Sequence, residues 1–167
     1  MKILCFSDTH GDPTFLRSAL AMHPDADAVF FLGDGLDDVY PFVRDDKRRP
    51  WYCVRGNCDR FSFSFEREIP AVETVTLGGK RITLTHGHLY GAKSGNGGLI
   101  ALGRETGADI VIFGHTHTPM ESYVEIPEGA IYLFNPGAAS YSYRGAPHFG
   151  IIMISEAGVL LSHGAFA

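Results

Sequence analysis

The sequence has few of the features that place a protein in a membrane or outside the cell. No apolar run approaches the ~18 residues of a membrane span, and the N-terminal apolar segment extends only from Ile3 to Phe6. The three cysteines, Cys5, Cys53 and Cys58, form an odd set without the spacing of a zinc ribbon. We therefore expect a cytoplasmic protein that has no contact with a membrane.

Positive charge is also scarce. The chain has 14 Lys and Arg residues against 19 Asp and Glu, and its one short basic run is Lys47-Arg48-Arg49, which we expect to be a solvated loop. Extended nucleic acids require a continuous basic surface, so they are not expected as partners. The length of 167 residues suits one compact domain, and we predict a single domain over residues 1–167.

What the chain does contain is a repeated pattern, in which a strand-like apolar run ends in a short polar cluster. The six pairs are KILCF before Ser7-Asp8-Thr9-His10, AVFFL before Gly33-Asp34, WYCVR before Gly56-Asn57-Cys58-Asp59, RITLT before His86-Gly87-His88, DIVIF before Gly114-His115-Thr116-His117, and AIYLF before Asn135-Pro136-Gly137. In an α/β sheet, ligands bind beyond the carboxyl ends of the strands, where the connecting loops converge. The pattern therefore predicts one shared metal site.

Hydrophobic spacing predicts both helices and strands. Helices are expected over 13–22, 37–44 and 98–106, and strands over 2–6, 28–32, 51–54, 110–113, 120–126, 130–134, 148–154 and 158–163. Pro41 must begin or kink the second helix, and Gly107 ends the third. Residues 70–85 predict a hairpin with a two-residue glycine turn. We predict an α/β fold of two packed, mixed β-sheets flanked by helices.

The polar clusters supply more metal-ligand side chains than one tetrahedral zinc ion accepts. The candidates are Asp8, His10, Asp34, Asn57, His86, His115 and His117. A lone histidine is usually a hydrogen-bonded structural residue, but four suitably placed ones favour a metal site. Two divalent ions fit this set better, and Asp34 is the expected bridge because a carboxylate has two oxygens. The mixed donors suit Mn²⁺, Fe²⁺, Ni²⁺ or Zn²⁺ without choosing among them.

The motifs, in this order, resemble the signature of the calcineurin-like metallophosphoesterase superfamily, and specifically its small prokaryotic phosphodiesterase branch. The resemblance runs from Asp8-Thr9-His10 through Gly114-His115-Thr116-His117 to Asn135-Pro136-Gly137, nearly the whole chain. It implies a four-layer α-β-β-α sandwich. It also implies that one metal is held by Asp8, His10, Asp34 and His117, and the other by Asp34, Asn57, His86 and His115. A hydroxide bridging the two ions would then attack phosphorus in line.

Cys58 departs from the superfamily pattern, because many members have a histidine here, supported by the following acidic residue, that donates a proton to the phosphate or leaving group. A thiol is a weak donor, so the resemblance favours substrates with good leaving groups. Asp59 then lacks its usual partner and is expected to orient Arg55, Arg60 or His88. His88 is expected either to face the substrate phosphate or to support His86.

We predict a metal-dependent phosphodiesterase that acts on small phosphodiesters, with Mn²⁺ as the leading metal. The residues expected to act in catalysis are Asp34, Asn57, Cys58, Asp59 and His88. Two alternatives stay open: a non-catalytic interaction scaffold of the retromer-subunit type, and a phosphomonoesterase. Loops 91–98 and 138–147, the second with Tyr141, Tyr143 and Arg144, are expected near the substrate. The partner is a small phosphoester, and a homo-oligomer is left open.

Overall fold

A computed structural model describes residues 1–59, 65–66, 68–141 and 145–166. In chain order its elements are β1 (Lys2–Phe6), α1 (Thr14–Met22), β2 (Ala28–Phe31), α2 (Leu36–Asp45), β3 (Trp51–Cys53), β4 (Val72–Leu77), β5 (Lys80–Thr85), the 3₁₀ turn η1 (His88–Tyr90), α3 (Gly97–Thr106), β6 (Ile110–Ile112), β7 (Met120–Ile126), β8 (Gly129–Asn135), β9 (His148–Ser155) and β10 (Gly158–Ala165). Among the described helices, none is long and apolar enough to cross a membrane.

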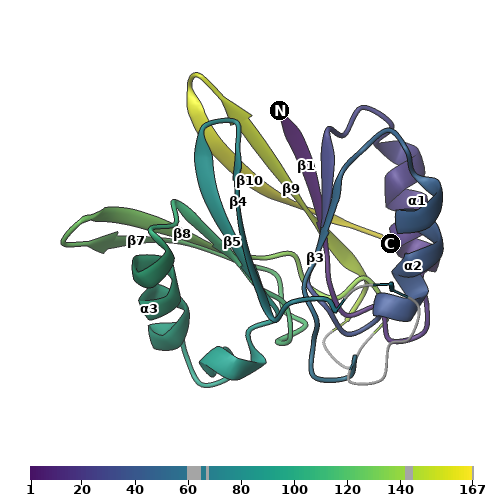
Figure 1. Cartoon of the computed structure of the whole chain (residues 1–167), viewed down its shortest axis with the longest axis horizontal. Helices are drawn as coiled ribbons and strands as arrows, with labels where there is room; N and C mark the ends of the chain where they lie inside the picture. Colours follow the sequence, from purple (N-terminus) through teal and green to yellow (C-terminus); the bar gives the residue numbers. More distant parts are fainter. Residues whose placement is uncertain (60–64, 67, 142–144, 167) are drawn as a thin grey trace.

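The strands form two mixed sheets, as the sequence predicted (Figure 1). The first has the order β10-β9-β1-β2-β3; β1, β2 and β3 run parallel, and β9 and β10 are antiparallel additions. The second has the order β4-β5-β6-β8-β7; β5, β6 and β8 are parallel, and β4 and β7 are antiparallel edges. Parallel central strands send their carboxyl ends to the same edge of each sheet.

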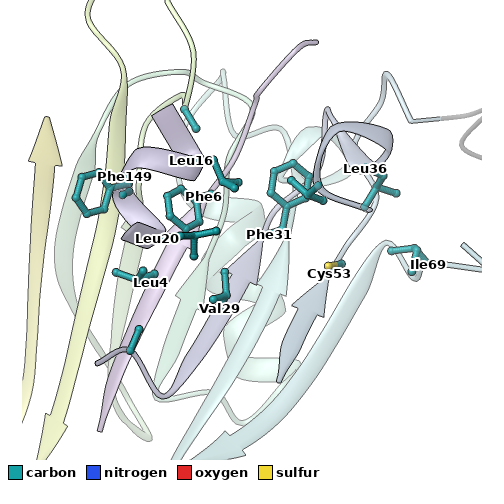
Figure 2. Packing of buried hydrophobic residues seen from close by; sticks show 14 residues of the cluster. Leu4, Phe6, Leu16, Leu20, Val29, Phe31, Leu36, Cys53, Ile69 and Phe149 are labelled. Atoms are coloured by element: carbon teal, nitrogen blue, oxygen red, sulfur yellow. The ribbon is translucent and has the colours of Figure 1, made fainter. Parts of the chain in front are cut away.

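Alternation of side chains along the strands divides the core into three layers. In β1, Ile3 and Cys5 face the second sheet, whereas Leu4 and Phe6 pack against α1 and α2. Figure 2 shows this outer layer, in which Phe6 lies beside Leu16 and Leu20 of α1. In the second sheet the inward strand residues meet the first sheet, and the outward ones form a separate cluster with α3. The layers are therefore helix, sheet, sheet, helix, as the resemblance implied.

Local sequence signals account for most of the element boundaries. The hairpin of β4 and β5 turns at Gly78 and Gly79, whose φ angles of +57° and +76° are those of a two-residue glycine turn. Gly107 has a left-handed φ of +63° and ends α3 as expected. Pro41 lies inside α2, which continues past it to Asp45. The 3₁₀ turn η1 was not predicted, since its residues carry no helical periodicity.

Candidate metal centre

The predicted ligands come together where the parallel strands end. The loops after β1, β2 and β5 meet at the lower edge of the molecule in Figure 1. Backbone hydrogen bonds tie these loops to one another: the Asp8 N–H donates to the Gly33 carbonyl at 2.9 Å, and the His10 N–H donates to the Asp34 carbonyl at 3.2 Å. The Gly114 N–H donates likewise to the His86 carbonyl at 3.2 Å. The shared edge of the two sheets thus collects side chains that are up to 109 positions apart, from Asp8 to His117.

The ligand atoms form two clusters of the kind that hold a metal ion. In one, atoms of Asp8, His10 and His117 lie within 4.8 Å of one another. In the other, Asp34, His86 and His115 do the same. Asp34 also lies within this distance of His10 and of the Cys58 sulfur, so its carboxylate stands between the two clusters.

The orientation of the donor atoms fits bound cations. The His10 and His117 Nε2 atoms face each other at 3.1 Å, and the His117 Nε2 is 3.2 Å from the Asp8 Oδ1. The buried atoms Asp8 Oδ1, Asn57 Oδ1 and His86 Nε2 have no hydrogen-bond partner within the described part of the chain. Leaving such atoms unsatisfied is costly, and cations bound at the two clusters would satisfy them. Mixed imidazole nitrogens and carboxylate or amide oxygens are the donors that divalent transition metals accept.

Backbone strain is concentrated at the same residues. The described residues other than glycine that have a positive φ are Asp8, His10, Asp34, His115 and His117, with φ between 47° and 67°. Each was predicted as a ligand from the sequence. Left-handed conformations of such residues cost energy and persist where the surrounding structure enforces them, typically at functional sites.

Two glycines leave room for the two buried carboxylates. A Cβ atom on Gly56 would collide with the Asp34 Oδ1, and one on Gly114 would collide with the Ser7 Oγ and lie 2.9 Å from the Asp8 Oδ2. Larger residues at either position would displace the carboxylate. The Gly-Asn and Gly-His pairs of the sequence motifs therefore have a steric reason.

Asp59 holds the loops after β2 and β3 together. Its Oδ2 accepts hydrogen bonds from the N–H groups of Asp34 and Gly56, both at 2.7 Å, and its Oδ1 accepts from Gly35 and Leu36 at 2.9 and 3.0 Å. The last two N–H groups lie at the start of α2, where an acceptor and a negative charge are favourable.

The expectation that Asp59 orients Arg55 is wrong. The Arg55 guanidinium instead donates to Glu68 and to the Ile69 carbonyl, at 2.9 and 2.8 Å. The Asp59 carboxylate instead accepts hydrogen bonds from backbone N–H groups, because the loops after β2 and β3 direct these donors toward it. Arg60 lies outside the described residues.

Other supporting residues were not assigned from the sequence. Asp38 accepts hydrogen bonds from the Thr9 hydroxyl at 2.6 Å and from the Gly11 N–H at 2.8 Å, which fixes the loop after β1. The Asn135 side chain donates to the Gly114 carbonyl at 2.8 Å. The position of Asn135 directly after a strand was a signal, but nothing in the sequence indicated what it bonds.

The second cluster is oriented by a backbone carbonyl. The His86 Nδ1 donates to the Leu32 carbonyl at 2.7 Å, which directs Nε2 to within 3.3 Å of the Asp34 Oδ2. Such a bond sets both the tautomer and the ring orientation of a metal-ligating histidine. The His88 ring lies 5.4 Å from the His86 ring and 6.1 Å from the His115 ring, so it borders this cluster. Whether His88 faces the substrate or supports His86 stays a prediction.

The electrostatics of the site favour charged carboxylates. Burial by itself would raise the pKa of Asp8, but the neighbouring imidazoles of His10, His117 and His86 hold it well below the usual value. Burial also opposes ionisation of Asp34, yet its interactions with His86 and the Cys58 N–H lower its pKa to about 2. Both side chains are therefore anionic at neutral pH, which is the form that binds metals.

The histidines of the site differ in their protonation. Burial and the charges of His86 and Lys93 lower the pKa of His115 to about 4, so its imidazole is neutral and able to donate a lone pair. Burial disfavours the charged form of His86 as well, but the facing Asp34 and Asp8 carboxylates raise its pKa overall. A cation at His86 would compete with a proton for the same imidazole nitrogen.

Cys58 faces the space between the clusters. Its N–H donates to the Asp34 Oδ1 at 2.7 Å, and its sulfur accepts from the Asn57 amide at 3.1 Å. Burial and the Asp34 carboxylate raise the pKa of the thiol to about 11. The thiol is thus protonated at neutral pH but is a weak acid.

Loop 138–147 adjoins the site only in part. The Ser140 hydroxyl donates to the Asp8 carbonyl at 2.8 Å. Tyr141 is exposed and meets the Phe15 ring edge-on, with 5.2 Å between centroids. Tyr143 and Arg144 lie outside the described residues, so the proposed role of this loop stays a prediction.

The helix-sheet-sheet-helix architecture and the paired His and Asp clusters at one sheet edge define a metallophosphoesterase type of protein. The family model described as the calcineurin-like phosphoesterase superfamily domain matches residues 1–157, and the chain belongs to this family. The sequence is 30% identical over 165 residues to the phosphodiesterase YfcE of Escherichia coli strain K12, covering 88% of this chain and 84% of that protein.

Solved structures show the same fold. A structure described as a novel archaeal phosphodiesterase has a TM-score of 0.78 at 23% identity, and the match covers 99% of this chain and 100% of that one. Vps29 of Entamoeba histolytica in complex with Zn²⁺ has a TM-score of 0.72 at 22% identity, and the match covers 100% of both chains. At this level of identity the likeness concerns the fold alone, and it includes proteins named for vacuolar sorting.

Proposed function

We propose that this protein is a metal-dependent phosphodiesterase that hydrolyses small phosphodiesters. The observation that carries the proposal is the pair of neighbouring donor clusters: Asp34 belongs to one and lies within 4.8 Å of His10 in the other, and each cluster has a buried donor atom without a partner among the described residues, Asp8 Oδ1 and His86 Nε2. A family member named phosphodiesterase, YfcE, is 30% identical over most of this chain and supports the reaction class.

The proposed ligands of one ion are Asp8, His10, Asp34 and His117, and those of the other are Asp34, Asn57, His86 and His115. When bound, two divalent ions would supply an activated water and neutralise charge on the phosphate oxygens. Mn²⁺ is the proposed metal, with Fe²⁺, Ni²⁺ and Zn²⁺ as alternatives that the same donors accept.

The space beside the clusters suits a small substrate. A hollow of about 270 Å³ lies against His10, Asp34 and Cys58, and its other walls come from the loops after β1, β2 and β3 and from the first turn of α2. A phosphodiester placed here would meet the Cys58 thiol near its leaving group. Because that thiol has a pKa of about 11, it donates a proton poorly, and we expect esters with good leaving groups to react fastest.

A scaffold role is the second candidate, because Vps29 shares the fold. The retained set of donors, the strained backbone and the glycines that make room for Asp34 and Asp8 favour the enzyme. A phosphomonoesterase is the third candidate, and it differs in substrate rather than in metal site. The cytoplasmic location and a homo-oligomeric state also stay predictions.

The test is hydrolysis of an activated aryl phosphodiester by purified full-length protein, with Mn²⁺, Ni²⁺ and Zn²⁺ added separately. We expect metal-dependent turnover that a chelator suppresses and added metal restores. A matched aryl phosphomonoester should react more slowly. Folded, metal-loaded protein that is inert toward a broad set of phosphoesters but binds another protein would instead support the scaffold.

A further inference from the structure

A groove separate from the metal centre lies between α1, α2 and the segment that leads into β3. It has a volume of about 730 Å³, within the ~300–1,000 Å³ of small-ligand sites. Figure 1 shows α1 and α2 together on the outer face of the first sheet. Its apolar walls include Leu20 of α1, Phe42 of α2 and Trp51 of β3. The proposed hydrolysis makes no use of these residues.

Trp51 gives the groove a fixed aromatic surface. Its indole N–H donates to the Asp46 carboxylate at 3.3 Å, which holds the ring in place, and the residue is partly exposed. The neighbouring Phe42 ring lies under the Arg17 guanidinium, with 5.6 Å between the Arg17 Cζ and the ring centroid. A planar ring between such walls gains stacking and burial energy.

The same groove presents unpaired positive charge. Arg17, Lys47 and Arg48 line it and form no ion pair with a carboxylate in the parts of the chain that the structure describes. The Arg49 side chain is only 9% exposed, and its buried Nη1 has no hydrogen-bond acceptor among the described residues. A buried guanidinium N–H without an acceptor is costly, and an anion is its natural partner.

The acidic residues of the groove are already engaged elsewhere. The Asp46 carboxylate pairs with the Arg49 Nε at 2.7 Å, Asp45 pairs with Arg44 at 2.7 Å, and Asp38 accepts from the loop after β1. The charged lining side chains that have no ion-pair partner among the described residues are therefore cationic, and they lie beside the aromatic wall. This combination recognises a molecule with a planar ring at one end and phosphate at the other.

We propose that the groove between α1 and α2 binds a nucleoside phosphate, with the base against Trp51 and the phosphates at Arg17, Arg48 and Arg49. None of the proposed metal ligands lines the groove, so we expect binding to require no divalent ion. Both parts of the ligand contribute, because neither the aromatic wall nor the exposed arginines alone enclose a small molecule.

The experiment follows the fluorescence of Trp51, the sole tryptophan of the sequence, while full-length protein is titrated with ATP in the presence of EDTA. We expect a saturable change below ~1 mM ATP, with calorimetry giving the same affinity. Adenosine and inorganic tripolyphosphate, titrated separately, should each bind at least ~10-fold more weakly than ATP, because each lacks one half of the contacts.

The variant R17A/R48A should lose affinity at least ~10-fold, since it removes two charge-assisted contacts from exposed positions that the fold does not need. Two controls should bind ATP like the unmodified protein: Arg104→Ala, which removes a cation from α3, and His117→Ala, which alters the metal centre. The absence of saturation up to ~10 mM ATP, or full affinity in R17A/R48A, would overturn the proposal. Tripolyphosphate binding as tight as ATP would overturn the assignment of the base.

Discussion

Five of the proposed metal ligands hold a backbone conformation that their side chains disfavour. Each positive φ costs of the order of 1–2 kcal/mol, and the hydrogen bonds of the surrounding loops must offset this. In return, the left-handed turn lets residues two positions apart, such as Asp8 and His10, aim at one point. The left-handed backbone conformation therefore accounts both for the strain at these residues and for the direction in which their side chains point.

Asp34 is the proposed ligand of both ions, because it belongs to one cluster and lies within 4.8 Å of His10 in the other. We expect Asp34→Asn to lower kcat by at least ~10²–10³-fold while leaving the fold intact, because it removes the shared negative charge but keeps the shape. His88→Ala, the comparison variant, should lose less, about 10–100-fold, since His88 only borders the second cluster. Steady-state kinetics at saturating Mn²⁺, with circular dichroism to check folding, measures both. Near-normal turnover of Asp34→Asn would show that the shared-ligand assignment is wrong.

In the proposed reaction, Cys58 limits how well a leaving group is protonated. We expect Cys58→His to raise kcat/KM for poorly activated esters more than for aryl esters, by less than the ~10²–10⁴-fold of a well-placed general acid. The measurement is a series of esters graded by leaving-group pKa, with Cys58→Ser as the size-matched control. An unchanged slope in Cys58→His, with metal content intact, would rule out Cys58 as the cause of the preference.

The variant Asp59→Ala would not show whether Asp59 supports a histidine introduced at position 58. The Asp59 carboxylate accepts four backbone N–H groups, including those of Asp34 and Gly56. Its removal would disorganise the loops after β2 and β3, and a loss of activity would then say nothing about proton donation.

At the scale of elements, hydrogen bonds to Asp46 hold the connection from α2 to β3 in place. Its carboxylate accepts from the Arg48 N–H, the Arg49 guanidinium and the Trp51 indole, at distances from 2.7 to 3.3 Å. Burial would raise the pKa of Asp46, but these donors lower it below the ordinary value of 3.8. The ionised carboxylate is therefore the form that stabilises the fold.

This predicts a pH-dependent contribution of Asp46 to stability. A carboxylate with a depressed folded-state pKa contributes fully above its unfolded pKa, and the contribution is lost as the pH falls toward the folded-state value. Asp46→Asn should therefore lower the urea midpoint at pH 7, and the difference from wild type should shrink near pH ~3. Asp25→Asn, at an exposed ion pair, serves as the control with little effect at either pH. A difference that does not depend on pH would contradict the role of the ionised carboxylate.

At the scale of the whole molecule, bound metal should stabilise the fold, because the ligands come from loops spread over most of the chain. We expect about two Mn²⁺ ions per chain by elemental analysis. At ~100 times the dissociation constant, each ion adds ~2.7 kcal/mol and raises Tm by roughly 5–10 °C. Asp34→Asn should show a smaller shift. A stoichiometry that never exceeds one, with His86→Ala unaffected, would reject the two-ion site.

The sequence by itself predicted the candidate metal ligands that the structure brings together, and most of the strand and helix boundaries. Apolar runs that end in Asp, Asn or His marked the strand ends, and the Gly78-Gly79 pair marked a hairpin. These signals are local, since they depend on side-chain period and on the conformations that glycine alone accepts readily. The resemblance to the family added the expected division of the ligands into two sets, and the two clusters agree with this division for the residues they contain.

The tertiary structure decided what supports those residues and what else the surface offers. Asp59 bonds N–H groups about 24 positions earlier, and Asn135 bonds the loop that carries His115 and His117. No local pattern encodes such bonds, because they arise only when the sheets bring distant loops to one edge. The burial of Arg49 is likewise not encoded locally, because in the sequence this residue is part of a basic run expected to be solvated. The packing of α1, α2 and β3 instead buries its side chain and forms the groove, since burial depends on neighbours that are distant along the chain.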